Sequence, residues 1–199
     1  MSDLRPPEIV LVRHGETDWS RDGRHTGRTD VSLNDEGRAG AEALGEELRQ
    51  WRFVRVLTSP LARATETARL AGLGDVAEPR DDLLEWDYGA YEGKKTVEIR
   101  EERPGWTLWR DGVPGGETAD EVCERVDRVI RRARSVDGDV LLFGHAHCLR
   151  ALAARWVGRP VTDGRLYRLD TGSLSVLGYE RETPVIVHWN ATGSTPLTD

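Results

Sequence analysis

Lysine is almost absent from this sequence, since Lys94 and Lys95 are the only two among 199 residues. Net positive charge is absent as well: the formal net charge is −7 and the sequence pI is about 5.3. This balance argues against a broad electropositive face, so no nucleic-acid partner is expected. The other cations are all arginines, which suit bidentate contacts to phosphate but also accumulate in GC-rich genomes. A local anion pocket is therefore still allowed.

Cysteine is scarce too, and long apolar runs do not occur. Cys123 and Cys148 fall in segments with helical patterns and have no CxxC or metal-finger partner nearby, so we expect reduced core residues. No apolar run approaches the roughly 18 residues that a membrane span needs, and the N-terminal MSDLRPPE lacks the apolar centre of a signal peptide. The sequence thus predicts a cytoplasmic protein without a membrane partner.

Three apolar, β-branched runs predict strands that are covered on both faces: EIVLV, VRVLTS and DVLLFGH. Amphipathic helices are predicted between them from two stripes, which are Ala41, Leu44, Leu48 and Trp51, then Val122, Val126, Val129, Ile130 and Ala133. Such alternation is typical of an α/β fold. The length predicts one domain over residues 1–199, with disordered ends at about 1–7 and 191–199.

Cap and turn residues predict where several elements begin. The Ser-Pro pair that starts at Ser59 predicts a helix from that point. Thr118 and Glu121 have the spacing of a capping box, so a second helix is predicted to start near Thr118. Residues 173–190 contain two strand-like runs around a short polar turn, which predicts an antiparallel hairpin. The sheet should therefore be antiparallel at one edge.

Basic and imidazole side chains follow the three predicted parallel strands. Arg13 and His14 end the first strand, Arg63 follows the second, and His145 ends the third. Ligands of open α/β sheets bind beyond the carboxyl ends of the strands, so these side chains are expected to converge. Guanidinium groups offer forked donors to phosphate oxygens, and neutral imidazole is a nucleophile. The pattern predicts a pocket for phosphoryl transfer, whose cations would be costly to bury without an anion.

Six motifs occur in a fixed order: LVRHGETDWS, HTGRTDVSLNDEG, SPLARATETA, EWDYGAYEG, PGGET and FGHAHCLRAL. This set, which covers roughly Ile9 to Trp156, resembles the histidine phosphatase superfamily, which includes cofactor-dependent phosphoglycerate mutases and many acid phosphatases. The resemblance implies an α/β fold, a three-layer αβα sandwich with a mostly parallel central sheet and an antiparallel edge. The EWDYG form is most similar to actinobacterial acid phosphatases and the sedoheptulose bisphosphatase branch.

The resemblance also implies roles for individual residues. His14 matches the nucleophile that becomes phosphohistidine, and Glu85 matches the proton donor. The groups that would surround the phosphoryl group and contact the substrate are Arg13, Arg63 and a protonated His145. Further positions near the phosphate or substrate are matched by Ser20, which replaces an asparagine common in mutases, and by Thr26, Gly27 and Ala146. No metal and no cofactor is expected, because the arginines supply the positive charge.

Several residues have more than one interpretation. His147 could form a metal cluster with His14 and His145, but no HxxxH or carboxylate-ligand pattern supports one, so a role in shaping the pocket or facing the next helix is favoured. His25 is expected either in the pocket or on the surface, and His188 is expected to pack in the last strand. The segment 106–109, with its two tryptophans, is either a lid or a packed surface excursion, and packing is favoured.

The mutase pattern and this sequence differ at several positions. The segment between EWDYGAYEG and PGGET is short, and the mutase residues are replaced by Thr96, Asp87 and His147. These differences favour a metal-independent phosphatase that acts on small phosphomonoesters, including sugar phosphates, and releases inorganic phosphate. The alternatives are a phosphoglycerate mutase and a non-catalytic phospho-ligand-binding module, although binding alone needs neither nucleophile nor proton donor. A homodimer is left open.

Overall fold

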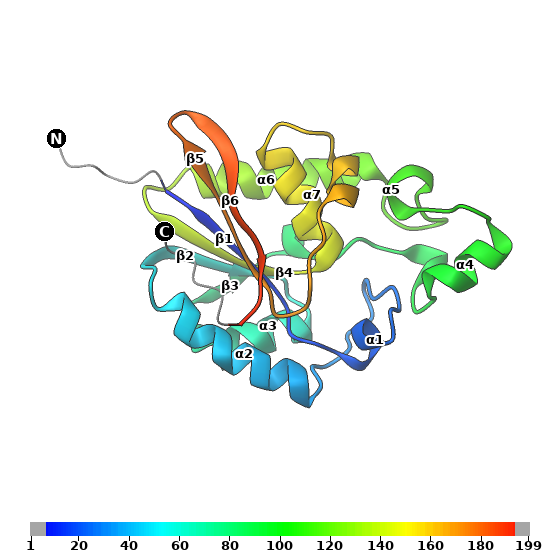
Figure 1. Ribbon diagram of the computed structural model, residues 1–199, viewed down its shortest axis with the longest axis horizontal. Coiled ribbons are helices and arrows are strands. Elements are labelled where there is room, and N and C mark those ends of the chain that lie inside the picture. The colour runs from blue at the N-terminus through cyan, green and yellow to red at the C-terminus, as the bar shows by residue number, and fades with distance from the viewer. Residues whose placement is uncertain (1–6, 194–199) are drawn as a thin grey trace.

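The computed structural model describes residues 7–193 and is built on one six-stranded sheet (Figure 1). Its strands are β1 (Ile9–Arg13), β2 (Phe53–Thr58), β3 (Ala77–Pro79), β4 (Asp139–Gly144), β5 (Leu174–Glu180) and β6 (Thr183–Ala191). In the order β3-β2-β4-β1-β5-β6, the first four strands run parallel, and the last two form antiparallel pairs. The sheet is mostly parallel with an antiparallel edge, as predicted.

Helices cover both faces of this sheet. The helices α2 (Asp35–Leu48) and α3 (Ala62–Leu70) lie on one face, and α6 (Ala119–Arg134) and α7 (Ala146–Trp156) lie on the other (Figure 1). Shorter elements complete the chain: α1 (Asp18–Arg21), α4 (Thr96–Glu102), α5 (Leu108–Asp111) and the 3₁₀ turns η1 (Asp81–Leu83), η2 (Gly89–Tyr91) and η3 (Val161–Leu166). The predicted three-layer αβα sandwich is confirmed.

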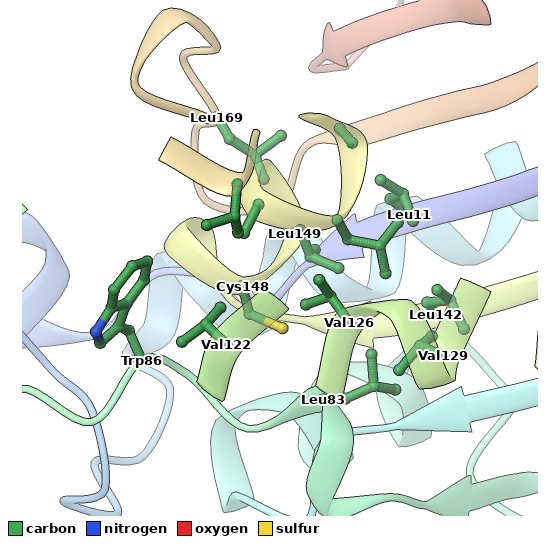
Figure 2. Packing of buried hydrophobic residues seen from close by; sticks show 14 of the residues in the cluster. Leu11, Leu83, Trp86, Val122, Val126, Val129, Leu142, Cys148, Leu149 and Leu169 are labelled. Carbon is green, nitrogen blue, oxygen red and sulfur yellow. The ribbon is translucent and has the colours of Figure 1, made fainter. Parts of the chain in front are cut away.

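The core consists of two apolar layers, one on each side of the sheet. Alternate residues of a strand point to opposite faces, so Val10 and Val12 pack with α2 and α3, whereas Ile9 and Leu11 pack with α6 and α7. Figure 2 shows the second layer, in which Leu142 of the sheet lies among helix residues of α6 and α7. Burial of both faces explains why these strands read as continuous apolar runs.

The capping box and the hairpin are confirmed. Thr118 caps α6, its side chain accepts the Glu121 N–H, and the Glu121 carboxylate accepts the Thr118 N–H. The two last strands pair antiparallel around a turn in which Arg181 has φ 56. Cys148 is a buried, free thiol in α7, and Cys123 is a free, half-buried thiol in α6.

Three local predictions were wrong or incomplete. The helix after Ser59 begins at Ala62, because Asp30 Oδ1 accepts the Ala62 N–H at 2.8 Å while the Ser59 hydroxyl bonds a histidine. Trp51 lies beyond the end of α2 and reaches the core from a loop, where its Nε1–H donates to Glu8. The edge strand β3 was missed, since three residues that include a proline have no readable periodicity.

A close backbone approach fixes the loop after β1 against the start of α2. A Cβ added at Gly37 would lie 2.1 Å from Glu16 O, and one added at Gly15 would lie 2.3 Å from Gly37 O. Only glycine fits at such distances. The packing of α2 therefore holds the residues that directly follow His14.

The predicted disordered ends fall mainly on residues 1–6 and 194–199, which lie outside the described residues. Ala191, which was included in the predicted disordered tail, is the last residue of β6. Within residues 7–193, no helix combines the length and the apolar character that crossing a membrane would require.

Candidate active site

The carboxyl ends of β1 and β4 bring two histidines together. The strands pair in parallel with Arg13 opposite Gly144, and the His14 N–H donates to Gly144 O at 3.0 Å. His14 directly follows β1, and His145 is the N-cap of α7. Their ring centroids lie 5.1 Å apart. The register of parallel strands thus places residues that are remote in sequence at one point.

His14 is a buried, neutral imidazole in a fixed tautomer. Burial, followed by the charges of Arg63 and Arg13, lowers the pKa of His14 well below its usual value. Its Nδ1 lies 2.7 Å from Gly15 O. A carbonyl can only accept, so Nδ1 carries the proton and Nε2 keeps a free lone pair. This is the nucleophilic form of the ring.

Arg63 and His145 form a fully buried pair beside His14. Arg63 Nε donates to His145 Nδ1 at 3.1 Å, and His145 Nε2 lies 2.7 Å from Ser59 Oγ. Because arginine keeps its protons, Nδ1 must accept, which places the single ring proton on Nε2. Burial and then the Arg63 charge lower the pKa of His145 well below its usual value. His145 is therefore neutral here, unlike the protonated form that the family resemblance implies.

The rest of the Arg63 guanidinium binds the loop that precedes α2. Its Nη1 donates to Thr29 O at 2.9 Å, and its Nη2 donates to Thr26 O and Gly27 O at 3.1 and 2.9 Å. Arg63 and His145 are both 0% exposed and do not line the pocket described below. Contact of these two residues with a phosphoryl group remains a prediction.

Arg13, unlike Arg63, lines the pocket directly. Its Nη1 donates to Leu169 O at 2.6 Å, whereas its buried Nε has no hydrogen-bond partner within residues 7–193. Burial lowers the pKa of Arg13 although the Glu85 charge opposes the shift. Buried donors are nearly always paired, so this guanidinium is suited to bind an anion.

Glu85 is held by backbone N–H groups on both sides of its carboxyl group. Oε1 accepts from Trp86 N at 2.8 Å and Cys148 N at 2.9 Å, and Oε2 accepts from His147 N at 3.0 Å. Burial favours the neutral acid, but the backbone N–H bonds, among them that of Trp86, outweigh it and hold the pKa of Glu85 well below its usual value. The free site therefore contains an ionised carboxylate whose remaining lone pair is on Oε2.

These groups meet at a pocket of about 430 Å³. Among the predicted site residues, it is lined by Arg13, His14, Ser20, Thr26, Glu85 and Ala146. The wall is completed by Gly23, Arg24, His25, Tyr88, His147, Arg150, Arg165, Leu166, Arg168 and Leu169. A larger hollow of about 610 Å³ lies against α2, α3 and β2 and shares no residue with this site.

Of the predicted contacts on the loop after His14, two line the pocket and one does not. The Ser20 hydroxyl donates to Thr17 O at 2.9 Å in the cap of α1, and the Thr26 hydroxyl donates to Arg24 O at 3.2 Å. Gly27 lies behind this wall, where its N–H donates to Glu92 at 2.8 Å. A Cβ at Gly27 would lie 2.7 Å from Trp86 O, so packing requires glycine there.

Four arginines of the pocket wall were not predicted from the sequence. Arg24, Arg165 and Arg168 come from loops or a 3₁₀ turn, where no periodic pattern identifies the inward face. Arg150 lies on α7, four residues after Ala146, a spacing that places both on one helix face. It is held by stacking on Trp109, with 5.0 Å from Cζ to the ring centroid, and by a 2.9 Å bond from Nε to Gly164 O.

The structure decides between the two interpretations of His25 and of the two tryptophans. His25 lines the pocket, and burial lowers its pKa to about 4. Trp106 and Trp109 are 2% and 9% exposed and do not line the pocket. They pack behind it, with Trp106 against His25 and Trp109 against His147 at centroid distances of 5.5 and 5.3 Å. The two tryptophans are therefore packed behind the pocket and do not form a lid over it.

His147 is bonded to a tyrosine of the pocket wall. Its Nδ1 lies 2.6 Å from the Tyr88 hydroxyl. Across residues 7–193 no group of three or more His, Cys, Asp and Glu side chains is arranged to hold a metal ion. His188, the fifth histidine, lies in β6.

A neutral histidine with a free ring nitrogen, an arginine and a carboxylate line one pocket of an αβα sandwich, an arrangement that is suited to phosphoryl transfer. The family model described as histidine phosphatase superfamily (branch 1) matches residues 9–192. The chain belongs to the histidine phosphatase superfamily.

Two curated relatives and one solved structure are similar over most of the chain. An acid phosphatase of Mycobacterium tuberculosis is 40% identical over 194 residues, which cover 96% of this chain and 95% of the relative. Sedoheptulose 1,7-bisphosphatase of Saccharomyces cerevisiae is 36% identical over 185 residues, which cover 76% of this chain and 68% of the relative. The solved structure of an open reading frame product from Mycobacterium tuberculosis has a TM-score of 0.91 and 40% identity, covering 95% of this chain and 100% of that one.

Proposed function

We propose that this protein hydrolyses small phosphomonoesters in two steps, through a phosphohistidine formed at Nε2 of His14. Its family and its relatives, an acid phosphatase and a sugar bisphosphatase, support a phosphoric monoester hydrolase. The observation that most strongly supports the covalent route is the tautomer of His14. Its Nδ1 is bonded to Gly15 O, so Nε2 is the ring nitrogen with a lone pair for attack.

In the first step, Nε2 of His14 attacks phosphorus, a P–N bond forms, and the P–O bond to the alcohol breaks. Arg13 stabilises the non-bridging oxygens, and the buried charge of Arg63 adds positive potential from the side of His145. Glu85 in its acid form donates its proton to the leaving oxygen, so a neutral alcohol departs. An incoming phosphate dianion favours the protonation of Glu85, because like charges raise the pKa of a carboxyl group.

In the second step, water attacks the phosphohistidine and the P–N bond breaks. The Glu85 carboxylate left by the first step accepts a proton from that water, which restores the acid form. Nε2 recovers its lone pair, and inorganic phosphate leaves the pocket. Protons and charges balance over the cycle without a metal ion or cofactor in either step.

Hydrolysis is favoured over mutase chemistry by two of the positions that differ from the mutase pattern. Thr96 does not line the pocket, and its hydroxyl is 3.2 Å from Nε2 of His25. Asp87 also lies outside the wall, where Oδ1 accepts the Gly89 N–H at 2.9 Å. Neither supplies a cation that would retain a bisphosphorylated intermediate. The sugar bisphosphatase relative supports sugar phosphates as the substrate class.

Two further expectations accompany this proposal. The free thiols of Cys123 and Cys148 support the reducing environment of the cytoplasm as the location. A homodimer stays a prediction, which sedimentation or light scattering of the purified chain would test.

The partition of the phosphoryl group between water and a second acceptor tests the proposed reaction. With 3-phosphoglycerate and catalytic 2,3-bisphosphoglycerate, we expect inorganic phosphate release or little reaction, because Thr96 and Asp87 supply no cation to the pocket at two positions where the mutase pattern differs. With p-nitrophenyl phosphate we expect ready turnover. Both reactions are followed by phosphate release and by coupled detection of 2-phosphoglycerate.

Chelation and vanadate serve as controls on the same assay. Exhaustive chelation should leave the rate unchanged, and vanadate should inhibit, because it can adopt the trigonal-bipyramidal geometry of phosphoryl transfer. Formation of 2-phosphoglycerate well above phosphate release would replace the phosphatase with a mutase. Loss of activity on chelation, restored by one divalent metal, would refute the metal-free mechanism.

A further inference from the structure

His147 lines the pocket, yet the two-step mechanism gives its side chain no task. It is the second residue of α7, and its side chain is 17% exposed. Its Nδ1 lies 2.6 Å from the Tyr88 hydroxyl, and its ring packs against Trp109. No residue in the described part of the chain forms a hydrogen bond with its Nε2. The ring is thus held in place while one nitrogen is left without a protein partner.

The Tyr88 hydroxyl fixes the tautomer of this ring. Burial, and then the charge of Glu85, raise the pKa of Tyr88 well above its usual value, so the hydroxyl keeps its proton. Burial also lowers the pKa of His147, so the ring is neutral. If the hydroxyl donates to Nδ1, the tyrosine proton is paired, whereas the opposite direction would leave it without an acceptor. The ring proton of His147 is therefore on Nε2.

The position of Glu85 shows what His147 would meet during the reaction. Oε1 of Glu85 already accepts two backbone N–H groups, so the transferable proton belongs on Oε2. His147 Nδ1 lies 3.9 Å from Oε2. A leaving oxygen that receives this proton must lie within hydrogen-bond reach of Oε2. The carbons next to that oxygen would then lie near the part of the pocket wall that includes His147 and Tyr88.

We propose that His147, oriented by Tyr88, is a specificity-determining residue that donates its Nε2–H to a hydroxyl group near the ester oxygen of the leaving group. The favoured substrates are accordingly phosphate esters of polyols, in which a hydroxyl is carried by a carbon close to the ester carbon. This inference rests on the proposed function, since it takes Glu85 as the proton donor.

The cost of leaving the Nε2–H of His147 unpaired would discriminate between leaving groups with and without a hydroxyl. A leaving group without a hydroxyl would leave the Nε2–H of this side chain, which is only 17% exposed, without a partner. A site with a hydrogen-bonding group for a substrate hydroxyl strongly rejects an analogue that lacks the hydroxyl. This discrimination is larger than the one an apolar site achieves between substrates that differ by a methylene group. The nearby guanidinium of Arg150 adds to the polar character of this wall.

Two esters with the same three-carbon chain test the inference. Glycerol 3-phosphate and n-propyl phosphate are both esters of primary alcohols, and only the first carries hydroxyl groups on the other carbons. For the wild-type protein we expect kcat/KM to be about tenfold or more higher for glycerol 3-phosphate. In His147→Phe this ratio should fall to about one, through loss on glycerol 3-phosphate, since the ring shape is kept and the donor is removed.

Three further variants separate recognition from a structural role. His147→Gln keeps an amide donor and should retain part of the ratio, and Tyr88→Phe should lower the ratio because the tautomer is no longer fixed. His188→Phe is the matched control in β6, outside the pocket, and should keep the wild-type ratio.

Two kinds of result would overturn the inference. One is a wild-type protein that shows no preference between the two esters, or a His147→Phe variant that keeps the preference. The other is an equal loss on both esters in His147→Phe, which would indicate a purely structural residue. The proposed function is tested separately by turnover of p-nitrophenyl phosphate in the wild-type protein, because that substrate has no aliphatic hydroxyl to recognise.

Discussion

Replacing His14 with alanine is expected to abolish turnover of every phosphomonoester, with kcat/KM lower by a factor on the order of 10⁴ or more. The loss should be this large because, in the proposed mechanism, this imidazole forms the bond to phosphorus. Its two neighbours at the strand ends cannot substitute: His145 is fully buried between Arg63 and Ser59, and Arg13 is a cation. Steady-state kinetics with p-nitrophenyl phosphate and with an alkyl phosphate measure the effect.

The control for this substitution is His188→Ala, which removes a histidine of β6 outside the pocket and should keep activity near the wild-type rate. Circular dichroism and the thermal midpoint of His14→Ala establish that the fold is intact. Since His14 is 5% exposed, His14→Asn provides a second variant that fills more of the space. Activity close to wild type in either His14 variant would refute the covalent mechanism.

Replacing Glu85 with glutamine is expected to slow hydrolysis of alkyl phosphates by about 10²–10⁴-fold, and to affect p-nitrophenyl phosphate much less. An alkoxide is a poor leaving group that needs a proton, whereas p-nitrophenolate departs without one. Glutamine is matched in shape, and its carbonyl can keep the two N–H bonds from Trp86 and Cys148. The ratio of kcat/KM for the two substrates therefore reports proton donation and not packing.

The pH dependence of the alkyl phosphate reaction supplies a second readout of the same residue. The pKa of Glu85 lies well below its usual value in the free site, so the fraction in the acid form falls as the pH rises above that pKa. The pKa of His14 is also lowered well below its usual value, so the nucleophile stays neutral into the acid range. The wild-type protein should thus be most active at acid pH, and its decline towards alkaline pH should be weaker in Glu85→Gln.

Asp87→Asn is the matched control, because Asp87 belongs to the same EWDYG motif but lies outside the pocket wall. It should leave the ratio between the two substrates unchanged. Equal losses on both substrates in Glu85→Gln, together with a changed ratio in Asp87→Asn, would assign the acid role to Asp87 instead.

The fold was largely predictable because its central strands have an unambiguous pattern. Ile9 to Val12 are buried on both faces, and a short run of that kind is typical of a central strand in a parallel sheet. The start of α3 was predicted too early for a reason that only the tertiary structure contains. Ser59 has the identity of a helix cap, but its hydroxyl bonds His145, and the remote Asp30 accepts the first N–H of the helix instead.

The candidate site was predictable where residues follow strands, and not where loops converge. Arg13, His14 and His145 occupy strand ends, and the motif order identified Glu85. The sequence did not indicate that Arg63 and His145 bond each other and leave the pocket wall, because that depends on how α3 packs beside β4. The role of His147 also stayed open in the sequence analysis, since its hydrogen-bond partner Tyr88 is 59 residues away. Contacts between residues so far apart in the sequence leave no pattern in the residues around either of them.

Trapping the covalent intermediate tests the central claim most directly. The protein is mixed with a rapidly cleaved phosphomonoester and quenched in alkali, where phosphohistidine is stable, and its peptides are then analysed by mass spectrometry. We expect the mass of one phosphoryl group on the peptide that contains His14, carried by a ring nitrogen, and no such peptide from His14→Ala. Label on another residue, or turnover by the wild-type protein with no label on His14 at any quench time, would contradict the account.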